Sequence, residues 1–258
     1  MCLNSIKKQT YPNLEIIVVD SNSRDGTPQV ARTYGAKLLN VTAERTKAKN
    51  FGATYAKGSY LFFVDSDIEL TEKMIEDCVK ACEEGFDAVI VGERIVGDGF
   101  WTKCRSLERA AYIGDDLVES PTFFRRQVFI DSGGYDENLV FGEEADLHQR
   151  ICALGFRIGR IPTLVLHHEG SFTRVVQRKY YYGKSSSAYI RRYGILAITQ
   201  FSPYRFFRAR TVQLLVKRPP WVLAILLSKT IEYIAGALGL IAGFLESKPH
   251  RRQFSDGN

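Results

Sequence analysis

Tyr60-Leu61-Phe62-Phe63-Val64-Asp65-Ser66-Asp67 is the stretch around which the fold of this sequence is organised. Its first five residues are apolar and rich in aromatic types, which predicts a strand buried on both faces. Two carboxylates, Asp65 and Asp67, follow directly. Ligands collect at the carboxyl ends of strands in an open α/β sheet, and paired carboxylates there suit Mg²⁺ or Mn²⁺ bound together with substrate phosphates. A polar turn that only ends a strand would show the same pattern.

The neighbouring sequence predicts an α/β domain. Leu14 to Asp20 is a second apolar run that ends in a carboxylate. Ala43 to Ala56 is expected to be a helix, Thr71 can cap a further helix that runs to Glu84, and Asp87 to Val91 is another apolar run. Strands that alternate with helices at this spacing predict parallel strands joined by crossover helices.

Charge is distributed unevenly along the 258 residues. The net charge is +6, but residues 170–231 carry twelve Lys and Arg and no Asp or Glu, so the remainder sums to −6. A basic segment on an acidic body is expected to face anions. The five cysteines follow neither a zinc pattern nor a disulfide framework, which favours a reducing compartment.

The last third of the sequence suggests attachment to a membrane. Phe172 to Tyr193 and a second helix opened by Pro203 are basic and aromatic. Val222 to Leu245 then has 24 residues with only Lys229 and Glu232 charged, enough to cross a hydrocarbon core. The two charges can pair on one face, and that face continues as glycines that allow close approach of another helix: Gly236, Gly239 and Gly243. We expect a membrane-embedded or interfacial helix; a core helix of a soluble fold is the alternative.

Five short motifs occur in an order typical of one enzyme family. They are Glu15–Thr27 (EIIVVDSNSRDGT), Ala48–Gly52 (AKNFG), Asp65–Asp67 (DSD), Gly133–Glu137 (GGYDE) and Gly142–Leu147 (GEEADL) with Arg150. From Cys2 to Ser171 the sequence therefore resembles family 2 glycosyltransferases, which have the nucleotide-sugar-binding GT-A fold. The resemblance implies a mostly parallel sheet with flanking helices, to which the basic and hydrophobic membrane-associated helices are appended. The basic-aromatic part is similar to that of members that act on lipid-linked acceptors.

The resemblance also implies roles on the donor side. Asp67 would bind Mg²⁺ or Mn²⁺ with Asp65, which would lie nearer the ribose of a UDP- or GDP-linked sugar. The other residues implied at the nucleotide sugar are Asp20, Ser21, Lys49 and Ser66. His167 or His168 would complete the metal site, because a neutral imidazole can ligate such an ion.

On the acceptor side, an inverting transfer needs a carboxylate that deprotonates the attacking hydroxyl. By its place in the motif Glu144 is this base, and Asp146 is the alternative because the family usually has Asp at position 144. Glu143 and Asp136 would lie near the acceptor, and Arg125 could bind an acceptor phosphate. A turn or helix-start role for the acids is the structural alternative.

Family members begin with a further strand, and we expect that strand to be missing from this sequence. Loss of a central strand exposes two sheet edges, so we expect weak folding or weak nucleotide binding. The predicted organisation is a GT-A domain (1–170), basic-aromatic juxtamembrane helices (171–220), the hydrophobic helix (221–246) and a polar tail (247–258).

The predicted function is metal-dependent, inverting transfer of a sugar from a nucleotide donor to a lipid-linked or other saccharide acceptor near the membrane. We expect the protein at the cytoplasmic face, on anionic lipid, with a possible homo-oligomer through the C-terminal helix. The rivals are a nucleotidyltransferase of similar fold and a catalytically dead scaffold that binds sugar nucleotides. Basic side chains interleaved with aromatics also occur in nucleic-acid binders, but the adjoining apolar helix favours a bilayer, so no nucleic-acid partner is expected.

Overall fold

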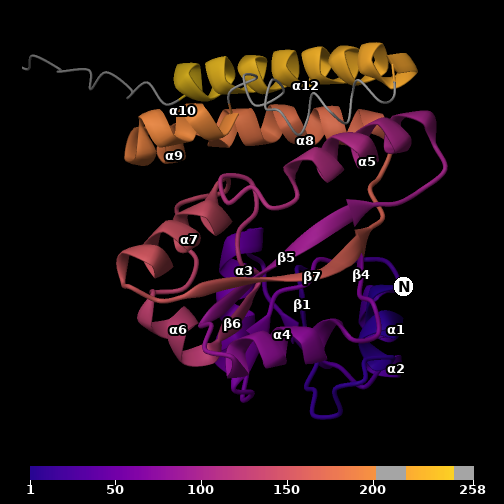
Figure 1. Cartoon of the computed structure of the whole chain (residues 1–258), viewed down its shortest axis with the longest axis vertical. Helices are drawn as coiled ribbons and strands as arrows, with labels where there is room; N and C mark the ends of the chain where they lie inside the picture. The colour runs from indigo at the N-terminus through magenta and orange to yellow at the C-terminus, as the bar shows by residue number, and fades with distance from the viewer. Residues whose placement is uncertain (202–218, 247–258) are drawn as a thin grey trace, which may run out of the picture.

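The computed structural model describes residues 1–201 and 219–246 (Figure 1). Part of the expected basic-aromatic segment and the polar tail lie outside these residues. The strands are β1 (Ile17–Asp20), β2 (Lys37–Asn40), β3 (Tyr60–Phe62), β4 (Ile68–Glu69), β5 (Ala88–Ile95), β6 (Phe123–Arg125) and β7 (Ile158–His167). The helices are α1 (Cys2–Lys7), α2 (Thr27–Thr33), α3 (Arg45–Tyr55), α4 (Met74–Glu83), α5 (Phe100–Tyr112), α6 (Arg126–Asp131), α7 (Glu143–Ala153), α8 (Phe172–Ser185), α9 (Ser187–Tyr193), α10 (Ile195–Phe201) and α12 (Pro219–Glu246).

The strands form two sheets. β1 and β2 pair in parallel as one small sheet, and the other five strands follow the order β3-β6-β5-β7-β4. In the larger sheet β5 and β7 are parallel, whereas β3–β6, β5–β6 and β4–β7 are antiparallel. The expectation of a mostly parallel sheet is therefore wrong for this sheet, which is mixed. The expectation followed the strand–helix alternation of the first ninety residues, and the short strands β4 and β6 give too weak a periodic signal to be recognised.

Two apolar clusters cover the two faces of the larger sheet. On one face Met74 and Cys78 of α4 pack against Val89 and Phe123. On the other face Phe124 packs with residues of α6, α7 and their loops. Phe123 and Phe124 are both buried although they are neighbours, because successive side chains of a strand point to opposite faces. The buried sheet thus fixes the turns at its carboxyl end, where the candidate site lies.

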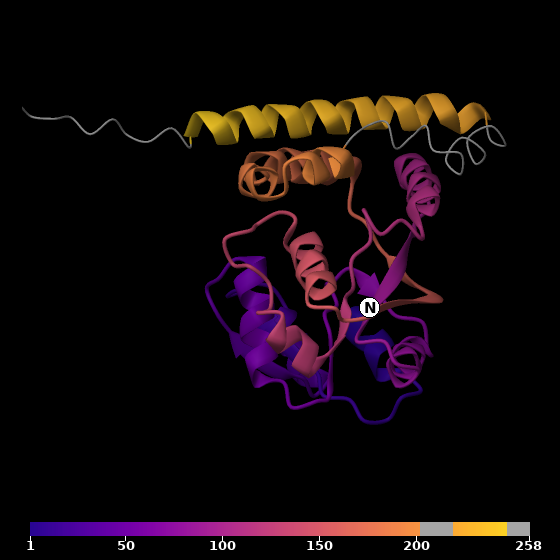
Figure 2. The same ribbon diagram turned by 60° about the vertical axis from the view of Figure 1, so that its left-hand side comes forward.

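The C-terminal helices form a separate layer on this domain. In both views α12 runs along the outside of α8, and α8 lies between α12 and the domain (Figures 1 and 2). The two helices touch backbone to backbone, because a Cβ atom on Gly239 or Gly243 would collide with the carbonyl oxygens of Tyr180 and Lys184. The predicted glycine face therefore meets another helix, and that helix is α8 of the same chain.

One helix of the described residues, Trp221–Glu246, is long and apolar enough to cross a bilayer by length and composition. Its outer face is exposed and apolar at the spacing of helical turns. The exposed residues include Leu223, Leu227, Ile234, Leu238, Ile241 and Leu245. The inner face is charged at the middle of the helix, where Glu232 is only 3% exposed.

Seven charged side chains of α5, α8, α12 and the segment after β7 form a cluster around the buried carboxylates of Glu169 and Glu232, which we call the ion cluster. Its members are Arg105, Glu108, Glu169, Arg178, Lys179, Lys229 and Glu232. Lys229 contacts Glu108 at 2.5 Å and Glu232 at 2.8 Å. Arg105 joins Glu232, at 2.6 Å, to Glu169. These pairs fasten the middle of α12 to the domain beneath it.

Candidate active site

The turn Asp65-Ser66-Asp67 follows β3 at the carboxyl end of the sheet. The amide of Ile68 donates to the Asp65 carbonyl at 3.1 Å, which closes the turn and starts β4. The side chains of Asp65 and Asp67 are 46% and 43% exposed, and Ser66 is exposed between them. Two carboxylates that are half open to solvent can receive a ligand there.

Asp67 begins a chain of charged groups that runs into the domain. The Nε2 atom of His167 lies 3.2 Å from Asp67 Oδ2, and its Nδ1 atom lies 3.4 Å from Glu93 Oε2. Hydrogen bonds to both carboxylates raise the pKa of His167 to about 9, and the bond from His167 lowers the pKa of Asp67. Burial tends to raise the pKa of Glu93, but Arg109 at 3.2 Å and His167 outweigh it and lower this pKa to about 2.

The two predicted histidines are placed differently. His167 ends β7 and reaches Asp67, whereas His168 turns to Glu69, with 2.8 Å between Nε2 and Oε2. The backbone amide of His168 donates to the Asp67 carbonyl at 2.9 Å. His168 therefore supports the Asp65–Asp67 turn through its backbone, and only His167 has its imidazole at Asp67.

The donor set at this turn fits a hard divalent cation. Carboxylate oxygens are suitable ligands for Mn²⁺ or Mg²⁺, and such ions commonly take one or two carboxylates and complete their shell with substrate phosphates. Both ring nitrogens of His167 face carboxylates, so in this arrangement His167 orients Asp67 and has no nitrogen left for an ion. Among residues 1–201 and 219–246 no group of three His, Cys, Asp or Glu side chains is arranged to hold an ion by itself. The open carboxylates Asp65 and Asp67 therefore fit an ion that shares its site with a phosphate-bearing substrate.

Two cations on α3 join this turn to the start of α7. Lys49 Nζ lies 3.7 Å from Asp65 Oδ1 and 2.9 Å from Glu144 Oε1. Arg45, one helical turn earlier, lies 3.5 Å from Asp65 Oδ2 and also binds Glu143. Residues four apart on a helix project from the same face, so a single surface of α3 gathers acids from both motifs.

The two glutamates at the start of α7 differ in environment. Gly142 precedes them with φ 81°, and a side chain there would collide with the Tyr189 ring, so the turn requires glycine. Glu143 is 2% exposed, and burial beside the Glu144 carboxylate raises its pKa. Glu144 is 36% exposed, and the Lys49 ammonium lowers its pKa. Glu144 is therefore ionised, open to solvent and next to the Asp65–Asp67 turn.

Asp146, the alternative base, is completely buried and surrounded by donors. Arg150 contacts its Oδ2 atom at 2.7 and 2.8 Å. Arg192 and the Tyr193 hydroxyl contact Oδ1 at 2.8 and 2.6 Å. A carboxylate whose two oxygens both accept charged or hydroxyl donors has little capacity left for a substrate proton. The structure gives Asp146 an anchoring place that ties α7 to α9.

Three further predicted residues lie outside the larger sheet. Asp20, 4% exposed, ends β1 and accepts the Ser23 amide at 2.9 Å. Ser21 is exposed and donates to the Ala43 carbonyl at 3.2 Å. Asp136 accepts the Asn138 amide at 2.9 Å and pairs with Arg192 at 2.6 Å. Asp136 is thus held by its own turn and by Arg192 of α9.

Arg125 is not brought to the site. It pairs with Tyr60 in the β3–β6 ladder, at the opposite end of β3 from Asp65. Its guanidinium donates to the carbonyl oxygens of Phe86 and Cys82. The structure therefore does not bring Arg125 to the Asp65–Asp67 turn, because Arg125 lies beside the first residue of β3 and the turn follows its last.

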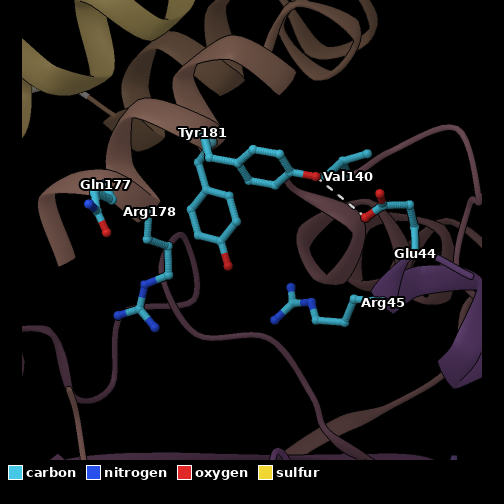
Figure 3. A pocket seen from close by; sticks show the side chains of 7 residues that line it. Glu44, Arg45, Val140, Gln177, Arg178 and Tyr181 are labelled. Carbon is cyan, nitrogen blue, oxygen red and sulfur yellow. Dashed lines mark hydrogen bonds between the residues drawn. The ribbon is translucent and has the colours of Figure 1, made fainter. Parts of the chain in front are cut away.

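Sequence reasoning missed Arg45, Glu93 and Arg178 as site residues. Arg45 could have been found from its spacing of four from Lys49, whereas Glu93 lies in a buried strand and Arg178 on a distant helix. Arg45 and Arg178 line a cavity of about 370 Å³ between α3, Val140 and α8 (Figure 3). Its other lining residues are Glu44, Gln177, Tyr181 and Tyr182.

Comparison with known proteins gives consistent matches. The profile of glycosyl transferase family 2 matches residues 1–137. Glycosyltransferase GlyG of Streptococcus pneumoniae is 36% identical over 98 residues, which are 35% of this chain and 33% of GlyG. The chain thus spans about a third of the length of this curated relative.

Two solved structures share the fold. Mannosyltransferase PcManGT from Pyrobaculum calidifontis, in complex with GDP-Man and Mn²⁺, has a TM-score of 0.60 at 17% identity, covering 95% of this chain and 81% of that one. Staphylococcus aureus TarS 1-349 in complex with UDP has a TM-score of 0.50 at 17% identity, covering 99% and 90%. At this identity the likeness shows the GT-A-like α/β fold. Since the profile matches more than half of the chain, this protein belongs to glycosyl transferase family 2.

Proposed function

We propose that this chain carries out metal-dependent, inverting transfer of a hexose from a UDP- or GDP-linked donor to an acceptor hydroxyl at a membrane surface. The observation that carries the proposal is the double contact of Lys49, whose ammonium lies 3.7 Å from Asp65 and 2.9 Å from Glu144. One cation thereby flanks the donor-side and the acceptor-side carboxylates. A single sugar held between them can be attacked on one side while its leaving group departs on the other.

On the donor side, the chain binds and orients the nucleotide sugar. Lys49 and Arg45 attract the phosphate end at the carboxyl edge of the sheet, where Asp65 and Asp67 would hold a divalent cation against it. Asp20 and Ser21 reach the nucleoside at the end of β1. When bound at Asp67 and Asp65, a divalent cation supplies Lewis-acid neutralisation of the departing nucleoside diphosphate. Lys49 and Arg45 add positive charge beside this leaving group.

On the acceptor side, Glu144 accepts the proton of the attacking hydroxyl. Lys49 lowers the pKa of Glu144, so the carboxylate is ionised at neutral pH and available as a base. Glu143 is buried against Arg45 and positions the first turn of α7. Asp146 ties α7 to α9 through Arg192 and Tyr193 and does not accept the proton of the acceptor hydroxyl.

The membrane part of the proposal follows from how α12 is packed. Lys229 and Glu232, near the middle of α12, contact α5 and α8 of the domain. If α12 crossed the bilayer, this cluster would lie near the midplane, where each charge costs about 2.5–3.5 kcal/mol by insertion scales. A helix that lies in the interface keeps these charges on the protein side and its apolar outer face in the lipid. We therefore propose that α12 lies in the plane of the membrane.

The surrounding charge favours an anionic leaflet. The segment from Gly170 to Ile231 has twelve basic and no acidic residues, and each Lys or Arg close to an anionic surface contributes about 1 kcal/mol. The cysteines of the described residues are free, which agrees with a cytoplasmic, reducing setting. Because the glycine face of α12 is occupied by α8, a homo-oligomer through this helix would have to use its apolar outer face.

The test of catalysis uses two variants with matched controls. With a panel of UDP- and GDP-sugars and Mn²⁺ or Mg²⁺, Asp67→Ala should abolish metal-dependent nucleotide binding, whereas the exposed Asp98→Ala should not. Glu144→Gln should keep nucleotide binding and stop transfer, and Glu84→Gln, on the surface after α4, should be active. Normal turnover by Glu144→Gln would contradict the assignment of the base. Pyrophosphate release would instead favour a nucleotidyltransferase, and binding without any turnover would favour a scaffold.

The test of membrane attachment is vesicle flotation with phosphatidylglycerol and phosphatidylcholine. Ile234→Lys places a charge on the outer face of α12, where Ile234 is 55% exposed, and should weaken binding. Ile130→Lys makes the same change at a 52% exposed residue of α6 on the domain. Equal loss in both variants would count against the proposed lipid face.

A further inference from the structure

The cavity between α3 and α8 has a guanidinium on each side. Figure 3 shows Arg45 and Arg178 pointing into the same space from two different elements, with Tyr181 directed to Glu44. The Tyr181 hydroxyl lies 3.4 Å from Glu44 Oε2. At about 370 Å³ the cavity is at the small end of the range for small-molecule sites. It therefore has room for a compact polar group.

One end of the cavity reaches the proposed reaction centre. Arg45 contacts both Asp65 and Glu143, so its side chain separates the cavity from the donor-side and acceptor-side acids. A molecule in the cavity that presents a hydroxyl past Arg45 would approach Glu144. The cavity is thus placed for the acceptor, and not for the nucleoside at β1.

The Arg178 side of the cavity carries surplus positive charge, and Arg178 adds to the effect of His167 in lowering the pKa of Asp67. Arg178 pairs with Glu169 at 2.6 Å, but Glu169 is already held by a two-pronged contact from Arg105. The ion cluster to which they belong has four cations and three carboxylates. Arg178 is its member at the cavity and is 37% exposed. A guanidinium has five N–H donors in a planar fork that matches a phosphate.

We propose that this cavity binds a phosphate group of the acceptor, with Arg178 as the main ligand and Arg45, which contacts Asp65 and Glu143, as the second cation. The proposal rests on the glycosyltransferase function above and specifies its acceptor as a phosphorylated molecule. The proposal assigns the phosphate to Arg178 of α8. The sequence had suggested Arg125, which the structure places at the other end of β3.

Binding of two phosphate monoesters tests this, measured by calorimetry on the full chain. Glycerol 3-phosphate represents a soluble phosphate, and dihexanoyl phosphatidic acid below its micelle concentration represents a lipid headgroup. Arg178→Gln should weaken both by about 10- to 100-fold, the range for lost hydrogen bonds to a charged group. Arg174→Gln removes the same charge from an exposed site of the same helix, outside the cavity, and should leave both affinities unchanged. The tighter of the two ligands identifies the source of the phosphate.

A second variant guards against a folding defect in Arg178→Gln, since Arg178 also holds Glu169. Gln177→Arg adds a guanidinium at an exposed residue that lines the cavity and should tighten phosphate binding several-fold. Failure of both ligands to bind the wild type, equal losses in Arg178→Gln and Arg174→Gln, or a loss only of nucleoside diphosphate binding would overturn the proposal. Glu144→Gln should keep phosphate binding, so the phosphate site can stand even if the transferase activity fails.

Discussion

Replacement of Gly239 by alanine tests the contact on which the C-terminal layer depends. A Cβ atom at this position would collide with the Tyr180 carbonyl oxygen on α8. Carbon–oxygen contacts between helices are normally about 3.3–3.6 Å, whereas the added Cβ would lie 2.0 Å from this oxygen, so the two helices would have to separate by roughly 1.5 Å along this stretch. Overpacking of this kind costs about 1–3 kcal/mol, from which the higher helix propensity of alanine, at most about 1 kcal/mol, must be subtracted.

Gly236 supplies a matched control on the same helix. An alanine Cβ there would have its nearest neighbour, the Lys179 carbonyl oxygen, at 3.8 Å, an ordinary contact. Gly236→Ala should therefore stabilise the protein by up to about 1 kcal/mol through helix propensity alone. The same substitution three residues apart is expected to have opposite signs.

Thermal unfolding in a mild detergent measures both variants. For a chain of this size 1 kcal/mol corresponds to roughly 2–4 °C in Tm, so Gly239→Ala should melt several degrees below Gly236→Ala. Gly239→Ala should also weaken phosphate binding at Arg178, because α8 carries that residue and loses its support. Equal Tm values for the two variants would refute the close packing of α8 on α12.

Three further outcomes are expected. Lys49→Met should shift the acid limb of the pH–rate profile to higher pH, because Lys49 lowers the pKa of Glu144 and the base is active only when it is ionised. Lys49→Arg keeps the positive charge and should leave this limb where it is. An unchanged limb in Lys49→Met would argue against Glu144 as the base. Tyr193→Phe should lower stability by about 1–3 kcal/mol, since its hydroxyl donates to the buried Asp146 at 2.6 Å, whereas Tyr180→Phe, at an exposed residue, should not change Tm. Burial tends to raise the pKa of Asp136, but the Asn138 amide and Arg192 lower this pKa overall. The contribution of Asp136 to the free energy of unfolding is therefore complete above the usual aspartate pKa of about 3.9 and is lost as the pH falls below that value. The loss of stability in Asp136→Asn relative to wild type should be present at pH 7 and shrink toward pH 3, and a loss that is the same at both pH values would exclude this linkage.

The sequence alone identified the family and placed acids at the ends of two apolar runs. Apolar runs that end in Asp20 and in Asp65-Ser66-Asp67 mark the carboxyl ends of strands, and the family profile and solved relatives confirm the resemblance. The helix of residues 221–246 and its glycine face were also predicted correctly. These features are local, because they depend on periodicity and on short motifs. The weak nucleotide binding expected for this chain stays a prediction.

Other features required the tertiary structure. The mixed sheet depends on β4 and β6, which are too short to give a pattern. The environments of Glu144 and Asp146, two residues apart, differ in burial and in the donors that α3 and α9 bring to them. Arg45 and Arg178 meet at one cavity although 133 positions separate them in the sequence. A pattern along the chain records which residues are apolar or charged, but the charge partners that set a carboxylate's ionisation come from elements that only folding brings together.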